Sequence, residues 1–255
     1  MRARSAFSAF LLLALVSPTL ALAVTVVPPG TGTLQAAIDA ATPGAVLVMT
    51  GGDYVGPVVV DRPLAIVCAT TCMIDANCEA PVALDIASDR VVVRSVGRRD
   101  SNIQVFRGTD TQIRVANHSH VDLRRTHGFK LFFNSCGTEQ VGIEVSGTSS
   151  KVRVRETLTP NNPHAGILLS GLSARSKVQV TGGYNADSAV GVLIENSAVG
   201  SARGKSRITV DKTTFVRVDR KVVRPRAELV TLSRALLAKH WARRPTKNPV
   251  ARFAQ

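Results

Sequence analysis

The chain has 255 residues, of which 45% are hydrophobic and only 4% are aromatic, and its formal net charge is +14. This length supports one sizeable core, which Val, Ile, Leu and Ala must fill because large rings are scarce. The charge is uneven: residues 220–255 hold ten Lys and Arg and one acid, whereas residues 24–219 hold 20 basic and 17 acidic residues. The nearly balanced main region argues against nucleic-acid binding by the protein as a whole.

Residues 1–23 have the three regions of a secretory signal peptide. Arg2 and Arg4 give a basic start, the apolar stretch over residues 9–16 is too short to span a bilayer, and residues 21–23 have the small-x-small pattern that signal peptidase accepts. No later stretch reaches about 18 uninterrupted apolar residues, so no membrane span is predicted. We therefore expect a secreted or periplasmic protein.

A short helix over residues 33–41 is the first element predicted after the signal peptide. Apolar residues recur from Leu34 at positions i, i+3, i+4 and i+7, Thr33 is the expected N-cap, and Pro43-Gly44 marks the end of the helix. The helix therefore has a single apolar face.

From residue 45 onward the sequence changes to short runs that are rich in Val and Ile and are separated by Gly, Ser, Asn, Asp and Thr. No amphipathic helix lies between these runs, which excludes parallel βαβ units and leaves a β-solenoid, a sandwich or a barrel. The predicted strands are residues 45–49, 58–60, 64–68, 82–86, 90–94, 103–106, 112–116, 141–145, 151–155, 166–170, 177–181, 191–195 and 207–211.

An internal repeat distinguishes between these folds. The run at residues 142–147 is echoed at residues 166–171 and again at residues 191–196, so the copies begin at nearly equal intervals, and a second echo follows each copy. An interval of about two dozen residues with two or more strands is one solenoid coil, whose inward side chains are buried only when coils stack. Tight hairpin turns of the Asn-Gly kind, which are typical of a sandwich, are scarce. We therefore predict a β-solenoid over residues 24–219.

Four segments near the start of this domain, residues 34–41, 43–48, 51–54 and 58–64, follow one another as helix, turn and short strands. In this order they resemble the beginning of the pectin-lyase-like right-handed parallel β-helix superfamily. The resemblance implies an all-β, single-stranded right-handed parallel β-helix whose short N-terminal helix caps the open end of the coil stack. It specifies no function, because the superfamily contains lyases, hydrolases, esterases, isomerases, phage tailspikes and adhesin-like proteins.

The basic tail, residues 220–255, departs from the repeat. Residues 226–241 are predicted to form an amphipathic C-terminal helix, with Pro225 in its first turn and Pro245 beyond its end. Two roles are open for this helix: a lid on the last coil, which we favour, or a basic helix on an anionic surface. Nucleic-acid binding through the tail is a third, weaker hypothesis, and residues 243–255 are expected to be disordered.

The four cysteines are expected to form up to two disulfides after export to an oxidising compartment. Three pairings are open, and the sequence does not choose between them. The cysteine spacing is not that of a zinc ribbon and no His lies nearby, so we predict no metal at the following residues: Cys68, Cys72, Cys78 and Cys136.

The candidate ligand-binding residues are Lys151, Lys177 and Arg207. They occupy equivalent positions of successive coils, so a β-helix would stack them about 5 Å apart, where like charges in water repel by roughly 0.8 kcal/mol per pair. An acidic polysaccharide lying along the helix axis would relieve this repulsion. The alternative is a screened surface ladder without a ligand.

A calcium-dependent lyase of uronate polymers needs acids on neighbouring coils and an Arg or Lys as base. Glu144 and Glu195 align only with uncharged residues of the next coils, so no acidic ladder is predicted there, and the absence of an Asp-Asp pair argues against a polygalacturonase-type hydrolase. The lyase alternative depends on residues of the earlier coils, namely Asp85, Asp89 and Asp122, with Arg124, Arg125 or Lys130 as the base.

The most polar segment, residues 117–127, contains three histidines. His118, His120 and Asp122 alternate, so on a strand they would share one face and would suit a metal site or a general base. A solvated face and turn is the interpretation that we favour. Residues 117–119 also form an N-glycosylation sequon.

Together these patterns predict an exported β-helix protein that binds extracellular or cell-surface polysaccharide, acidic if the cationic row takes part, without strong catalysis. The alternative is a small polysaccharide lyase acting on a uronate polymer, and whether the protein is an enzyme stays open. We expect no cofactor, and calcium enters only under the lyase alternative. The expected partner is a polysaccharide rather than nucleic acid, and no oligomeric state is predicted.

Overall fold

The computed structural model describes residues 23–97, 101–128, 136, 141–149, 151–159, 161–162, 164–173, 176–186, 190–195, 207–211, 214–216, 220–223 and 230–232. The predicted signal peptide, except Ala23, and most of the basic tail lie outside these residues. Among the described residues there is no helix that is long and apolar enough to cross a membrane.

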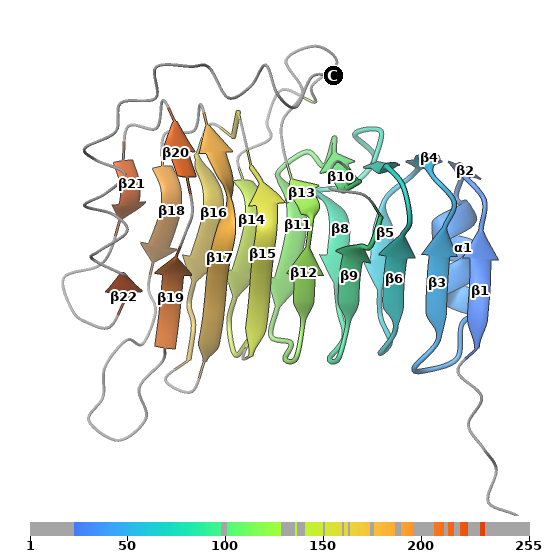
Figure 1. The fold of residues 1–255 in the computed structure, drawn as a ribbon, viewed down its shortest axis with the longest axis horizontal. Coiled ribbons are helices and arrows are strands. Elements are labelled where there is room, and N and C mark those ends of the chain that lie inside the picture. The colour runs from blue at the N-terminus through green and yellow to red at the C-terminus, as the bar shows by residue number, and fades with distance from the viewer. Residues whose placement is uncertain are drawn as a thin grey trace, which may run out of the picture.

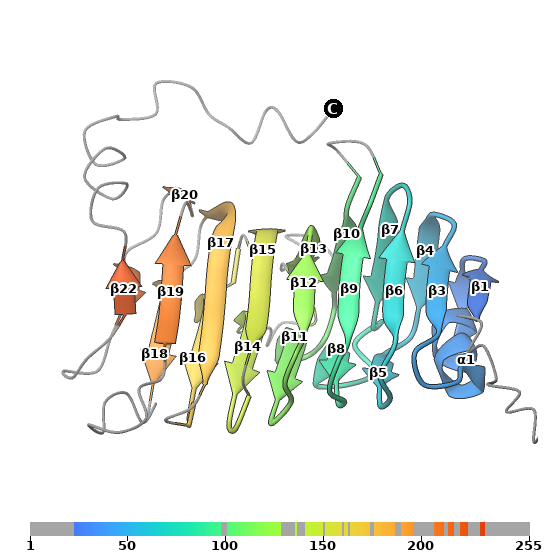
Figure 2. The same cartoon turned by 60° about the horizontal axis from the view of Figure 1, so that its bottom comes forward.

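Three parallel sheets, which we call A, B and C, surround one interior, and the chain passes repeatedly from sheet C to sheet A to sheet B (Figures 1 and 2). Sheet A consists, in spatial order, of β1 (Val24–Val27), β3 (Val46–Met49), β6 (Ala65–Cys68), β9 (Val92–Ser95), β12 (Asp122–Arg124), β15 (Val152–Leu158), β17 (Lys177–Ala186), β19 (Arg207–Asp211) and β22 (Val230–Leu232), and β20 (Thr214–Val216) also pairs with β17.

Sheet B lies in the earlier coils and consists of β2 (Gly30–Thr31), β4 (Gly52–Val55), β7 (Cys72–Asp75), β10 (Ile103–Phe106) and β13 (Thr126–Gly128). Sheet C runs through β5 (Val58–Val60), β8 (Val82–Ile86), β11 (Thr111–Ala116), β14 (Val141–Ser146), β16 (Ala165–Ser170), β18 (Val190–Glu195) and β21 (Arg220–Val223). Each strand pairs in parallel with the equivalent strand of the next coil, which is the architecture predicted from the repeat.

The interior is built from rows of apolar side chains that lie one above another on successive coils. Along sheet A, one inward row has no member more than 4% exposed, and it contains Leu47, Ile66, Val93, Leu123, Val154, Val180 and Val210. Similar aliphatic side chains pack well at the spacing of about 4.8 Å between rungs, and each stabilises the fold by roughly 1.5–3 kcal/mol when buried. This explains how a chain with few aromatic residues builds its core.

Helix α1 (Thr33–Ala40) covers the N-terminal end of the stack, beside β1 in Figure 1. Leu34 and Ile38 are buried in the same core as the strand residues, which confirms the predicted apolar face. The predicted N-cap was one residue too late. The cap is Gly32, whose φ of 69° favours glycine, and the Thr33 hydroxyl instead donates to the carbonyl of Pro28 at 2.9 Å.

A left-handed residue marks the bend from sheet A towards sheet B in three successive coils. Arg125, Glu156 and Gly182 have φ values of 50°, 52° and 63°, and the register of β12, β15 and β17 places them at equivalent positions. β15 and β17 continue through this bend. The bend therefore sets Arg125 and Glu156 on adjacent coils at the margin of sheet A.

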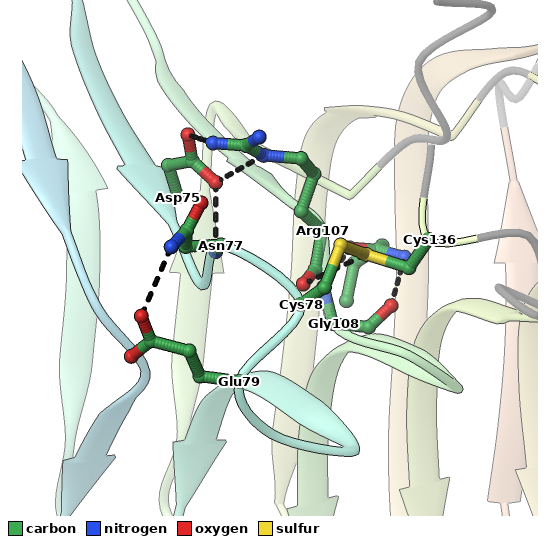
Figure 3. The surroundings of a disulfide bond; sticks show 8 residues. Asp75, Asn77, Cys78, Glu79, Arg107, Gly108 and Cys136 are labelled. Carbon is green, nitrogen blue, oxygen red and sulfur yellow. Dashed lines mark hydrogen bonds and ion pairs between the residues drawn. A yellow bond between two sulfur atoms is a disulfide. The ribbon is translucent and has the colours of Figure 1, made fainter. Parts of the chain in front are cut away.

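Two disulfides, Cys68–Cys72 and Cys78–Cys136, select one of the three pairings that the sequence left open. The first connects the end of β6 to the start of β7. The second spans 58 residues of sequence and, by the chain-entropy model, such a loop closure stabilises the fold by about 4 kcal/mol. Figure 3 shows it beside Arg107, whose carbonyl accepts from the Cys78 amide at 3.0 Å and whose guanidinium pairs with Asp75.

Every predicted strand overlaps an observed strand, but most of sheet B was missed. β2, β4, β7 and β13 are short and contain Gly, Asp, Cys or His, so they lack the run of Val and Ile that signalled the other strands. β12 was missed for the same reason, because the polar segment around it resembles a loop.

The predicted helix over residues 226–241 is wrong at Val230–Leu232, which form strand β22. β22 pairs in register with β19, and Val230 and Leu232 lie opposite Ile208 and Val210. Pairing with the preceding coil satisfies the strand's backbone groups along that edge and outweighs the helical spacing of the leucines. The remainder of the predicted helix lies outside the described residues.

Candidate functional site

The three predicted ligand-binding residues lie at the start of successive sheet A strands. The Cα atoms of Lys177 and Arg207 pair directly, and Val152 pairs with Val178, which places Lys151 level with Lys177. The structure therefore aligns the three positions as the sequence predicted.

Two further basic residues continue this line towards the N-terminus. Val92 pairs with Asp122, and Asp122 pairs with Arg153. Arg90, His120 and Lys151 each precede one of these paired residues by two positions, so they are level with one another on successive coils. We call the five positions the cationic column, which consists of Arg90, His120, Lys151, Lys177 and Arg207.

The backbone of the first three column members is unusual. Arg90, His120 and Lys151 have φ values of 57°, 60° and 54°, in the left-handed region where Arg and Lys are uncommon. The turn from sheet C into sheet A requires this conformation in each of these coils. A basic side chain at each position accepts a conformational cost of about 1 kcal/mol that Gly or Asn would reduce.

The column has little charge compensation. Arg90, Lys151 and Lys177 are exposed, and Lys177 makes no ion pair with any described residue. The Lys151 ammonium lies 2.9 Å from Nε2 of His120, within hydrogen-bond distance. The column is therefore a line of positive charge along the edge of sheet A.

The outward face of sheet A next to the column is also rich in arginine. Arg94, Arg124 and Arg155 form one outward row, and Arg153 stands beside Asp122 in the other row. Arg155 donates to Asp122 through both nitrogens of its fork, with Nε 3.1 Å from Oδ1. Arg94 and Arg153 are exposed and have no carboxylate partner among the residues that the structure describes.

Glu156 neutralises part of this face. Its Oε1 accepts from Arg124 Nη2 at 3.0 Å and its Oε2 accepts from Arg125 Nε at 2.9 Å. Partial burial alone would raise the pKa of Glu156, but the hydrogen bonds from Arg125 and Arg124 outweigh it and hold this pKa below its ordinary value of 4.5. The resulting charged face has five arginines against two carboxylates, and its residues are Arg94, Asp122, Arg124, Arg125, Arg153, Arg155 and Glu156.

The outward face of sheet C is different because its charges alternate. Asp85, Arg114 and Glu144 lie in one row, and Arg114 donates to both oxygens of Asp85, with Nε 3.1 Å from Oδ1. These hydrogen bonds raise the pKa of the Arg114 guanidinium. The row then continues through Leu168 and Leu193, which confirms that Glu144 has no acidic neighbour on the following coil.

The acids proposed for a lyase do not gather at one place. Asp85 belongs to sheet C and pairs with Arg114, whereas Asp122 belongs to sheet A and pairs with Arg155. The third acid, Asp89, accepts from the Ser119 amide at 2.6 Å, and this hydrogen bond lowers the pKa of Asp89.

The candidate bases of the lyase hypothesis are Arg124, Arg125 and Lys130. Arg124 and Arg125 both donate to Glu156, so their guanidinium groups are already engaged with a carboxylate of the protein. Lys130 lies outside the described residues.

The predicted shared face of His118, His120 and Asp122 was wrong. β12 begins only at Asp122, and the left-handed turn at His120 breaks the alternation that a continuous strand would have. The three side chains have separate partners: His118 lies 3.5 Å from Asp89, His120 contacts Lys151, and Asp122 pairs with Arg155. Within the described ranges, no three His, Cys, Asp or Glu side chains are placed to share a metal ion.

No family model and no curated protein matches the sequence. Among solved structures, a mutant of the PL6-family alginate lyase AlyGC has a TM-score of 0.50 at 11% identity, over 86% of this chain and 40% of that one. The mannuronan C-5 epimerase AlgE4 A-module of Azotobacter vinelandii has a TM-score of 0.43 at 14% identity, over 82% of this chain and 58% of that one. Pectate lyase Pel9A has a TM-score of 0.38 at 12% identity, over 83% and 79%.

The three stacked parallel sheets define the class of this protein as a right-handed parallel β-helix. More particularly, the coil stack, with a short helix over its N-terminal end, shares its fold with the PL6-family alginate lyase. The chain spans less than half the length of the PL6-family alginate lyase, so the likeness concerns the coil stack alone.

Proposed function

We propose that this chain is an exported β-helix protein that binds an acidic polysaccharide along the cationic column and the charged face, without strong catalysis. The observation that carries this proposal is the column itself. It places one basic residue on each of five successive coils in a single line along the helix axis.

The geometry suits a linear, regularly charged polymer. Rungs of a parallel β-helix are about 4.8 Å apart, so the basic residues of successive coils form a regular row. A uronate chain that lies along this row would carry its carboxylates past one basic residue after another. Arg94 and Arg153, which project beside the column, add further guanidinium groups that suit planar carboxylates.

Two observations favour binding over polymer cleavage. The acids that would hold calcium are divided between sheet A and sheet C, and the two described candidate bases donate to Glu156. The fold resembles that of a PL6-family alginate lyase, which is consistent with a polysaccharide ligand. A similar fold does not imply that this chain catalyses the same reaction.

The test is equilibrium binding to oligomannuronate and oligogalacturonate at low salt. The Lys151→Gln/Lys177→Gln variant is expected to lose up to about thirtyfold in affinity, because it removes two exposed charge pairs that each contribute up to about 1 kcal/mol. Arg114→Gln on sheet C removes one positive charge elsewhere and is the control, with affinity expected within twofold of the unmodified protein. Equal losses in both variants, or no binding by the unmodified protein, would contradict the proposal. Unsaturated uronate products in the same mixtures would establish the lyase alternative.

A further inference from the structure

The charged face of sheet A is continuous with an apolar surface on the earlier coils. The two outward rows that carry Arg94 and Asp122 hold only Val and Ala in the coils before them. We call this surface the valine face, and its residues are Val24, Val46, Ala65 and Val92 in one row and Val26, Val48 and Val67 in the other.

Part of the valine face is open to solvent. Val24 and Val26 are each 62% exposed, and the members from β3, β6 and β9 are partly exposed except Val67. The outward side of a sheet that faces water normally carries polar residues, and the same rows do so from Arg94 onward. A contiguous exposed apolar patch on a protein surface commonly marks a binding site. The valine face is therefore a candidate binding surface.

A ligand of this surface must be compatible with both the charged face and the valine face. A linear ligand that lies along the charged face reaches the valine face at its end, because both are parts of the same two rows. The ligand that complements this order is anionic along one part and apolar at the other. A second copy of the chain is a poorer ligand. Its valine face also adjoins an excess of arginines, so the positive charges of the two copies would repel each other.

We propose that the ligand is a lipid-linked acidic polysaccharide, with its glycan on the charged face and its acyl chain on the valine face. This inference rests on the proposed function and adds the chemical nature of the ligand's end. Apolar burial and attraction of an anionic headgroup to basic side chains would then act together, as they do for proteins at anionic lipid surfaces.

The test compares two probes: an oligomannuronate that carries one palmitoyl group at its reducing end, and the same oligomannuronate without it. Affinities are measured below the concentration at which the acylated probe forms micelles. For the unmodified protein we expect the acyl group to increase affinity at least tenfold. The Val24→Thr/Val26→Thr variant should lose most of this gain and keep its affinity for the plain oligosaccharide.

Threonine has nearly the shape of valine and favours strands, so these variants should retain the fold, and thermal unfolding checks this. Val46→Thr is a second variant on the same face in case the first disturbs β1. Val59→Thr is the matched control, because Val59 is 41% exposed on sheet C and should leave the acyl gain unchanged.

The outcomes separate the two proposals. If both probes bind the unmodified protein equally, the glycolipid inference is wrong and the proposed polysaccharide binding stands. If neither probe binds, both are wrong. A gain that survives in the valine variants would overturn the inference. So would a dimer, detected by sedimentation, that the Val24→Thr/Val26→Thr variant dissociates.

Discussion

Sheets A and C enclose the same interior, but their outward faces differ in charge. Their inward rows are aliphatic and in register, because packing at one rung spacing admits little else. On the outside of sheet C, Arg114 lies between Asp85 and Glu144, so two carboxylates flank one arginine. On the outside of sheet A, five arginines face two carboxylates beside a column of further cations. The stacking of coils therefore fixes the core and leaves the outward rows free to differ, so specific ligand chemistry is to be sought there.

Binding to either outer surface requires an intact fold, and His127 on β13 limits the pH range in which the fold is stable. The residue is 6% exposed, its Nδ1 accepts from the Leu158 amide at 2.8 Å, and burial, with the nearby Arg125 charge, lowers the pKa of His127 to about 3. The folded state thus favours the neutral ring, so this contribution is complete above pH 6.5 and is lost as the pH falls from 6.5 towards 3. We expect a loss of up to about 5 kcal/mol in unfolding free energy.

Denaturant unfolding at a series of pH values measures this loss. The His127→Asn variant keeps an acceptor for the Leu158 amide without a titrating ring, so its stability should depend less on pH over this interval, although it starts lower at pH 7. Parallel curves for the two proteins would show that another group controls the acid lability.

Charge position, rather than total charge, should decide polyanion binding if the two outer surfaces differ as described. Lys177→Glu reverses one charge of the column and should lower affinity for oligomannuronate about thirtyfold at low salt. Val59→Glu adds a negative charge to sheet C and should change affinity less than twofold. Similar losses in the two variants would mean that the net charge of the protein, rather than the position of each charge, controls binding. Raised salt should reduce the effect of Lys177→Glu on affinity, because exposed charges are screened.

The smallest predicted effect concerns Glu156, which occupies two guanidinium groups of the charged face. Glu156→Gln should free Arg124 and Arg125 for the ligand and raise affinity two- to threefold, while lowering stability at pH 7 by less than about 1 kcal/mol because the side chains are partly exposed. Since the folded pKa of Glu156 is lowered, its stabilising contribution is present above pH 4.5 and is lost as the pH falls through the folded value. The stability difference between variant and unmodified protein should therefore disappear at low pH, which calorimetry can measure.

The sequence predicted the fold well where coils are short and regular. The copies that begin at Gly142, Gly166 and Gly191 recur at nearly equal intervals, and the structure pairs these strands in that register. The sequence could not align the earlier coils, because Asp122 pairs with Arg153 across a longer and less regular stretch of chain. Arg90 and His120 were therefore not recognised as members of the column.

The ion pairs of the site could not be predicted from the sequence for a related reason. Arg155 and Asp122, or Arg124 and Glu156, lie on different coils, far apart in the sequence, and meet only once the coil register is known. The exact register and the left-handed turns come from tertiary packing, which no local pattern encodes. Once the register and the turns are known, the three residues predicted from the sequence extend to the five-residue cationic column, and the arginines of the charged face are found beside it.

The column carries one basic position on each coil between Arg90 and Arg207. If it binds a linear polyanion as proposed, the number of these coils would set the length of polymer that the protein contacts. Duplicating or deleting one coil would then change that length by one rung and leave the other coils as they are. Changes in repeat number alone could thus adapt the protein to longer or shorter glycans.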